Sequence, residues 1–161
     1  MARAVRNDRP VRLGARARGV AAMLLLALPV LAPAAELAGL WQEYDDKTGR
    51  VEALIRVAQA DDGTYAGTIV KLVAEVVGSA APVCEGCSGS LHNQPLLGMR
   101  ILTGMRRKDA LTFEGGEIVD PEDGKVYRCR LRLSEDGRTL EVTGYVGVSW
   151  FGESETWRRA E

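Results

Sequence analysis

Several absences narrow the function of this 161-residue chain before any motif is considered. The chain has one histidine, His92, and no serine or cysteine stands in a recognisable pattern with a base and an orienting partner. Its main apolar run, residues 20–31, has twelve residues and contains Pro29, whereas a membrane-spanning helix needs about twenty. The sequence therefore predicts neither an enzyme nor a protein that stays anchored by a transmembrane helix.

The first 35 residues have the order of a secretory signal peptide. Six arginines and one aspartate precede the apolar run, and the small residues Ala32-Pro33-Ala34 follow it as a cleavage pattern. We expect cleavage after Ala34 or Ala35, which leaves residues 36–161 as one mature domain in the periplasm or outside the cell. The first cysteine, Cys84, is too far downstream to serve as a lipid-anchored N-terminus.

Cleavage also changes the charge of the protein. Removing residues 1–35 takes away six arginines and one aspartate, so the formal net charge falls from −1 to −6. An acidic domain has no long-range attraction for nucleic acid, so no nucleic-acid partner is expected. The compartment reached by export is oxidising, which allows disulfides to persist.

The mature region alternates apolar and polar residues between turn signals, which predicts an all-β domain. Short links favour antiparallel neighbours, and eight such strands can close into an up-and-down barrel; a β-sandwich is the alternative. Gly115-Gly116 predicts a bulge or sharp bend in the fifth strand. The eight predicted strands are Gly39–Tyr44, Val51–Ala58, Thr64–Val77, Met99–Met105, Leu111–Val119, Lys125–Leu133, Leu140–Val146 and Gly152–Arg159.

The sixth strand indicates which side of the sheet faces inward. Arg128, Arg130 and Arg132 alternate with apolar residues across residues 127–133. Three arginines facing hydrocarbon would be very unfavourable, which argues against an outer-membrane barrel. We therefore expect a barrel with an apolar inside and a charged outside.

Two stretches carry a family likeness. One is Gly39-Leu40-Trp41, and the other runs through residues 115–121, 124–127, 144–147 and 157–159, which contain GG-x-I-x-DP, GK-x-Y, GY-x-G and W-x-R. Together they resemble the bacterial exported family known as domain of unknown function 2147, over roughly residues 38–159. The resemblance implies a lipocalin-like barrel and brings no established activity.

The G-x-W and the terminal arginine also resemble the calycin signature. That resemblance implies that Trp41 lies across the closed base of the barrel and that Arg159, or alternatively Arg158, packs over its ring as a cation–π contact. Two positions depart from the family pattern, because Thr143 and Glu153 stand where basic residues are usual.

The end of the barrel opposite Trp41 is where a ligand would enter. In an up-and-down barrel, the links at 45–50, 78–98, 120–124 and 147–151 share that end. They bring His92, Trp150 and Phe151 to the mouth as candidate ligand contacts. The alternative is that the two aromatic residues only plug the barrel, whose interior eight strands can fill with their own side chains.

The three cysteines predict one disulfide. Cys84 and Cys87 form a C-x-x-C, and the bridge is either local or joins one of them to the inward-facing Cys129. No helix begins at the C-x-x-C to lower a thiol pKa, and Ser88 stands where c-type haem attachment needs histidine. Thiol-redox chemistry and a zinc site remain the lesser alternatives, and no cofactor or metal is expected.

These features favour an exported barrel that binds a small, partly apolar molecule. The alternative is a structural or interaction module of the cell envelope, with a filled barrel and an envelope protein as its partner.

Overall fold

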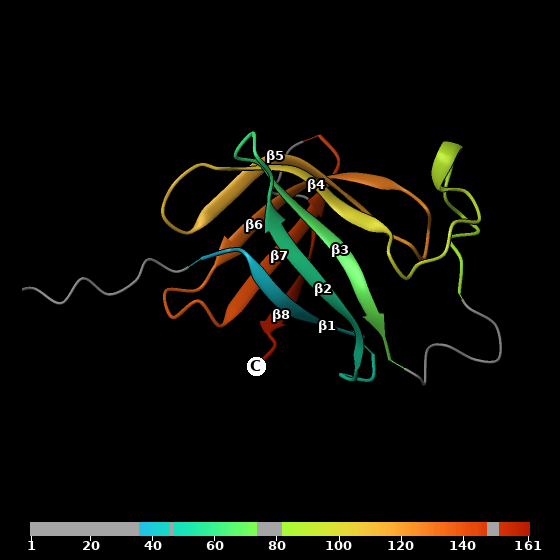
Figure 1. The fold of residues 1–161 in the computed structure, drawn as a ribbon, viewed down its shortest axis with the longest axis horizontal. Coiled ribbons are helices and arrows are strands. Elements are labelled where there is room, and N and C mark those ends of the chain that lie inside the picture. Colours follow the sequence, from blue (N-terminus) through green and yellow to red (C-terminus); the bar gives the residue numbers. More distant parts are fainter. Residues whose placement is uncertain (1–35, 46, 74–81, 148–151) are drawn as a thin grey trace, which may run out of the picture. The chain divides into compact units, whose positions relative to one another are not determined.

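The computed structural model describes residues 36–45, 47–73, 82–147 and 152–161, which belong to one compact unit (Figure 1). The expected signal peptide and the mouth candidates Trp150 and Phe151 lie outside these residues. The described chain forms eight strands and one 3₁₀ turn, η1 (Gly89–Leu91). The strands are β1 (Gly39–Tyr44), β2 (Val51–Gln59), β3 (Tyr65–Leu72), β4 (Arg100–Arg107), β5 (Thr112–Val119), β6 (Val126–Leu133), β7 (Thr139–Tyr145) and β8 (Glu153–Arg159).

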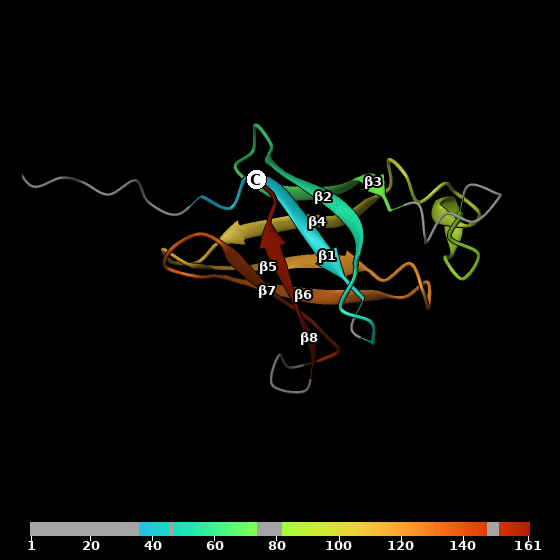
Figure 2. The same cartoon turned by 90° about the horizontal axis from the view of Figure 1, so that it is seen from below.

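The strands form a closed antiparallel barrel in chain order, which confirms the predicted architecture and excludes the sandwich. Each strand pairs with the next, and β8 returns to pair with β1 through Trp41 opposite Arg159 and Gln42 opposite Arg158. Figures 1 and 2 show β1 and β8 side by side at this closure. This closure pairs the first and last strands, which would otherwise be the two outer strands of an open sheet.

Side-chain parity decides which residues fill the barrel. On β6, Cys129, Leu131 and Leu133 are buried, whereas Arg128 and Arg132 are exposed. This confirms the inside and outside assigned from the sequence. Because strand side chains alternate with a period of two, the same rule turns Trp41 and Glu43 of β1 to one face.

The predicted irregularity in the fifth strand is confirmed as a β-bulge. The register between β5 and β6 shifts between Glu114 and Gly116, and Gly115 has a φ of 82°, which favours glycine. A Cβ on Gly116 would overlap the backbone of Thr103 and the sulfur of Met105. The pair of glycines therefore bends β5 and lets it lie close against β4.

Large side chains pack the half of the barrel nearest Trp41. Trp41, Trp157, Phe113 and Met105 are all fully buried, together with leucines of the neighbouring strands. This half contains the start of β1, and we call it the closed base. The other end of the barrel carries the links β1–β2, β3–β4, β5–β6 and β7–β8. No helix among the described residues is long and apolar enough to cross a membrane.

Candidate functional site

Arg159 closes the base of the barrel over Trp41, as the resemblance to the calycin signature implied. The Arg159 guanidinium carbon lies 4.3 Å from the centre of the Trp41 ring. Arg159 Nε donates to the Gly137 carbonyl at 2.6 Å, and Nη1 donates to the Ala38 carbonyl at 3.1 Å. Arg159 thus ties three chain segments together over the indole, while Arg158, the alternative candidate, lies 5.2 Å from the Tyr44 ring instead.

Glycine at position 39 makes room for this arginine. A Cβ there would overlap Nη1 of Arg159, and Gly39 has a φ of 148°. The Trp41 Nε1 atom donates to the Leu37 carbonyl at 3.0 Å, so its ring is fixed from below. In the G-x-W motif, Gly39 therefore makes room for the Arg159 guanidinium that covers Trp41.

A second cation–aromatic pair closes the base and was not expected from the sequence. The Arg107 guanidinium carbon lies 4.5 Å from the centre of the Phe113 ring, and Tyr65 packs edge-on against the same ring at 5.2 Å. Arg107 also approaches Glu36, at 3.6 Å, and the Tyr65 hydroxyl donates to Glu36 at 3.1 Å. Arg107 and Phe113 are partners across the β4–β5 pairing, whereas Glu36 and Tyr65 come from distant parts of the chain. No sequence motif marks these contacts, so sequence reasoning missed them.

At the open end, the β3–β4 link (described residues 73 and 82–99) is tied by a disulfide between Cys84 and Cys87. This is the local one of the two pairings left open by the sequence, and Cys129 remains a buried free thiol. The Cys84 sulfur lies 3.6 Å from the Pro121 carbonyl, and Gly86 packs directly on Gly124. The disulfide-closed turn is thus docked on the β5–β6 link.

His92, the described mouth candidate, is used within its own link. Its Nδ1 atom donates to the Cys87 carbonyl at 3.0 Å, and its Nε2 atom accepts from the Asn93 amide at 3.0 Å. The exposed His92 side chain therefore helps to hold the link around the disulfide, and both ring nitrogens have partners there.

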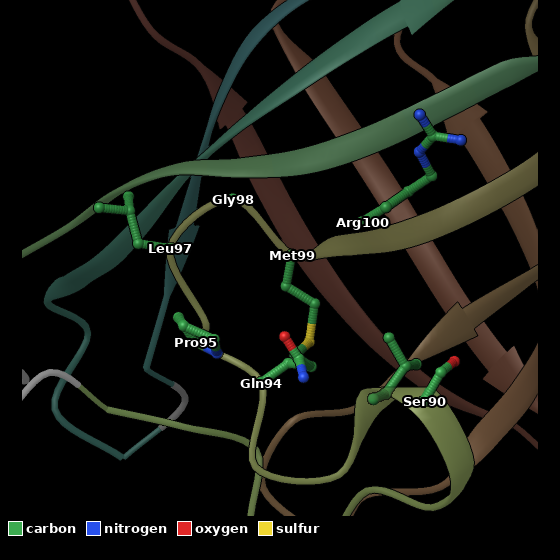
Figure 3. Close-up of a pocket in the computed structure, with 8 residues that line it drawn as sticks. Ser90, Gln94, Pro95, Leu97, Gly98, Met99 and Arg100 are labelled. Atoms are coloured by element: carbon green, nitrogen blue, oxygen red, sulfur yellow. The ribbon is translucent and has the colours of Figure 1, made fainter.

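The same link carries an open pocket of about 350 Å³. All of its lining residues fall between Ser90 and Arg100, and Figure 3 shows the side chains of Leu97 and Met99 on its wall together with Gln94 and Arg100. Leu97 is 57% exposed. The pocket belongs to the link and the first residues of β4, so it does not report on the barrel interior.

Inside the barrel, above the sealed base, lies a group that we call the inner acidic site: Glu43, Glu155, Trp157 and Cys129. Glu43 follows Trp41 on the inner face of β1, and Glu155 precedes the buried Trp157 on the inner face of β8. Continuing the β1–β8 register of Trp41 with Arg159 places Glu43 opposite Trp157. Cys129 reaches the same region from β6, because Glu155 acts electrostatically on its thiol.

Glu43 has the electrostatics of a carboxyl group enclosed by protein. Burial is the largest cause that raises its pKa from 4.5 to about 8, followed by repulsion from Glu155, Glu52, Asp120 and Glu122. These acids come from β8, β2 and the β5–β6 link. Glu43 is therefore largely protonated at neutral pH, although part of its side-chain surface is still accessible.

Cys129 and Trp157 are the two members of the site that carry no charge. Burial raises the pKa of the Cys129 thiol to about 12, so it stays protonated and behaves as an apolar lining residue. The Trp157 side chain is fully buried, and its Nε1 atom has no hydrogen-bond partner in the described part of the chain. A buried donor without an acceptor is unfavourable by about 1–3 kcal/mol.

The inner acidic site does not have the form of a metal centre. Across the described ranges, no three histidine, cysteine, aspartate or glutamate side chains gather closely enough to hold an ion. The acids that act on Glu43 are spread around it on three different elements. Sequence parity could have assigned Glu43 to the inner face, since it stands two residues after Trp41.

Comparisons with known proteins agree with this architecture. The family described as "Uncharacterized protein conserved in bacteria (DUF2147)" matches residues 39–159. Among solved structures, protein HP1028 of the human pathogen Helicobacter pylori, described as belonging to the lipocalin family, is similar with a TM-score of 0.66 and 23% identity. The similarity covers 78% of this chain and 84% of that one. A search of curated proteins finds no match.

Proposed function

The chain belongs to the DUF2147 family of bacterial proteins, and on that premise we propose that it is an exported envelope protein that binds a small, partly apolar molecule inside its barrel. A lipocalin-like barrel is suited to this, because eight strands enclose a space that holds either packed side chains or one small ligand. Residues 1–35 support export to the periplasm or beyond, because an arginine-rich start is followed by an apolar run and then by small residues.

One observation favours a ligand over a filled interior. Glu43 keeps part of its surface accessible even though burial is the main cause of its raised pKa. We infer that this carboxyl group borders the part of the barrel in which the ligand would lie. The fully buried Trp41 and Trp157 pack the base of the barrel, so the ligand would occupy the half above them.

Thermal unfolding and native mass spectrometry test this function. The purified protein is incubated with a lipid extract of the bacterial envelope, and we expect a rise in Tm together with a bound small molecule in the mass spectrum. Unchanged Tm and an empty spectrum across envelope extracts, lipid and aqueous, would contradict ligand binding.

A second function is favoured by the distribution of exposed apolar side chains. Val126 and Val146 are 52% and 76% exposed, and both stand next to links of the open end, as does Leu97 on the β3–β4 link. Apolar residues gathered on one rim are typical of a surface that meets another protein. This interaction module would show no ligand-induced shift in Tm, and Val146→Asp would weaken its complex with the envelope partner.

A further inference from the structure

The outer face of β2, β3 and β4 carries two arginines that have no acidic partner. Arg56 of β2 is opposite Thr68 of β3, and Thr68 is in turn opposite Arg100 of β4. Both arginines are exposed, and neither forms an ion pair or hydrogen bond with a described residue. Because neighbouring strands lie about 4.8 Å apart, the two arginine Cα atoms are about 10 Å apart with the threonine between them. Their long side chains can therefore reach one anion placed over Thr68.

Exposed apolar side chains lie next to this basic row. The backbone of Ile69 is bonded to the start of β4 on both sides, since its N–H donates to the Met99 carbonyl at 3.0 Å and its carbonyl accepts from Gly98 at 2.8 Å. This pairing brings the next residue of β3, Val70, alongside Leu97. Val70 is 40% exposed and Leu97 is 57% exposed. The outer face therefore changes from basic to apolar over a short distance along β3.

The pocket of about 350 Å³ continues this apolar surface. Leu97 and Arg100 both line the pocket, and Leu91, Pro95 and Met99 supply the rest of its apolar wall. In Figure 3, the Met99 side chain points into the link, whereas Arg100 projects to the other side of its strand. Pockets that hold small molecules begin at roughly 300 Å³. The pocket thus has room for a short apolar chain and has a guanidinium group at its border.

The wall of the pocket is held in place by bonds within the β3–β4 link. Val83 forms a β-bridge with Pro95, and the Leu96 N–H donates to the Pro82 carbonyl at 3.0 Å. The disulfide described above closes the turn that follows Val83. A wall that is already ordered reduces the entropy that binding would otherwise cost.

We propose that this outer face binds a phosphate monoester that carries an apolar tail. The phosphate lies between the guanidinium groups of Arg56 and Arg100, above the Thr68 hydroxyl, and the tail runs along Val70 and Leu97 into the pocket. We call this the outer anion site. It lies outside the barrel, so it is a second site beyond the proposed function.

The two arginines favour phosphate over carboxylate as the acidic group. A guanidinium group is planar and presents forked N–H donors that match the oxygens of a phosphate. A phosphate monoester carries a charge of about −1.5 to −2 at pH 7, so it can balance two arginines, whereas a carboxylate balances one. The Thr68 hydroxyl can donate a further hydrogen bond to the same group.

Calorimetry on the purified protein at pH 7.5 tests the site with matched probes. Octyl phosphate, octanoate and octan-1-ol share a chain and differ in the group at its end. We expect octyl phosphate to bind at least about tenfold more tightly than the alcohol and several-fold more tightly than octanoate.

The length of the tail is tested with butyl phosphate. A fully buried CH₂ group strengthens binding about fourfold, and in an open pocket we expect roughly half of that free energy, or about twofold for each CH₂. Octyl phosphate should therefore bind about tenfold or more tightly than butyl phosphate, and inorganic phosphate should bind more weakly still.

An arginine variant assigns the phosphate to its position. Arg56→Gln should weaken octyl phosphate binding about tenfold and leave octan-1-ol binding unchanged, because Arg56 does not line the pocket. Arg132→Gln is the control for losing one positive charge, because Arg132 is exposed on β6 and should bind both probes as the parent protein does.

A second variant assigns the tail to the pocket. Leu97→Asn should reduce the difference in affinity between octyl and butyl phosphate and leave the affinity for inorganic phosphate unchanged. Val126→Asn is the control, because Val126 is an exposed apolar residue of β6 that is not part of the site. All four substituted side chains are exposed, so circular dichroism should show the same barrel in each variant.

Several outcomes would overturn the outer anion site. Equal affinity for octyl phosphate and octan-1-ol or octanoate would remove the phosphate group, and equal affinity for octyl and butyl phosphate would remove the tail. Octyl phosphate binding that neither Arg56→Gln nor Leu97→Asn changes would place the probe elsewhere, inside the barrel included. Binding to vesicles of phosphatidic acid without binding of octyl phosphate would make the face a membrane contact instead. None of these results bears on a different ligand inside the barrel, which the envelope extracts test separately.

Discussion

Replacing Glu43 by glutamine should make the protein more stable at neutral and alkaline pH. The substitution preserves the size and shape of the side chain and removes the group that ionises. Burial and four neighbouring acids raise the pKa of Glu43 from 4.5 to about 8. In the parent protein, the folded state therefore keeps a proton that the unfolded chain has already lost across this interval.

The size of the effect follows from that interval. Each pKa unit corresponds to about 1.4 kcal/mol of free energy. The contribution of Glu43 to stability is fully present below pH 4.5 and is lost as pH rises through about 8. Between pH 5 and pH 8.5 the free energy of unfolding should fall by about 4 kcal/mol through this one group, and Glu43→Gln should lack that fall.

Urea unfolding at a series of pH values measures the difference. Trp41 and Trp157 are fully buried, so tryptophan fluorescence reports unfolding of the barrel directly. Glu141→Gln serves as the control for losing one carboxyl group on the exposed face of β7. Parallel stability curves for the parent and Glu43→Gln would place the Glu43 carboxyl in bulk solvent and refute the enclosed acid.

Three further predictions concern the base, the disulfide and export. Gly39→Ala should lower stability by about 1–3 kcal/mol in urea unfolding, because the new Cβ displaces Arg159 and φ at this position is 148°; an unchanged midpoint would contradict the seal. Replacing Cys84 and Cys87 by serine should cost about 2 kcal/mol, the loop-closure value for so short a loop, and leave the circular dichroism of the barrel intact; loss of the β signal would mean that the turn holds the barrel. Protein recovered after export should have the mass expected for cleavage after Ala34 or Ala35, and a full-length mass would exclude the signal peptide.

Local sequence patterns were sufficient to predict the barrel and which side chains of its strands face inward or outward. Gly115-Gly116 predicted the bulge in β5 because glycine is the residue that tolerates φ values such as 82°. Alternation across residues 127–133 predicted the buried face of β6, since a strand turns successive side chains to opposite sides. Turn residues and alternating apolar and polar residues are local features that extend over only a few positions, so one sequence is enough to recognise them.

The pairing of the cysteines needed the three-dimensional structure. Sequence parity placed Cys129 on the inner face and left it as a possible partner of Cys84 or Cys87. Whether the β3–β4 link dips into the barrel depends on its docking against the β5–β6 link, where Gly86 meets Gly124. That contact keeps the local bridge between Cys84 and Cys87 at the rim.

What the sequence determined by itself is therefore the order of the strands and their inner and outer faces. The resemblance to the calycin signature implied Trp41 with Arg159 or Arg158 at the base, and the structure selected Arg159. Only the tertiary structure decided that Glu43 is an enclosed acid and that the Trp157 N–H has no acceptor among the residues described. The physical reason is range. Alternation and turn chemistry act between chain neighbours, whereas burial and Coulomb repulsion act through space and bring Glu43 of β1 under the influence of acids on β8, β2 and the β5–β6 link.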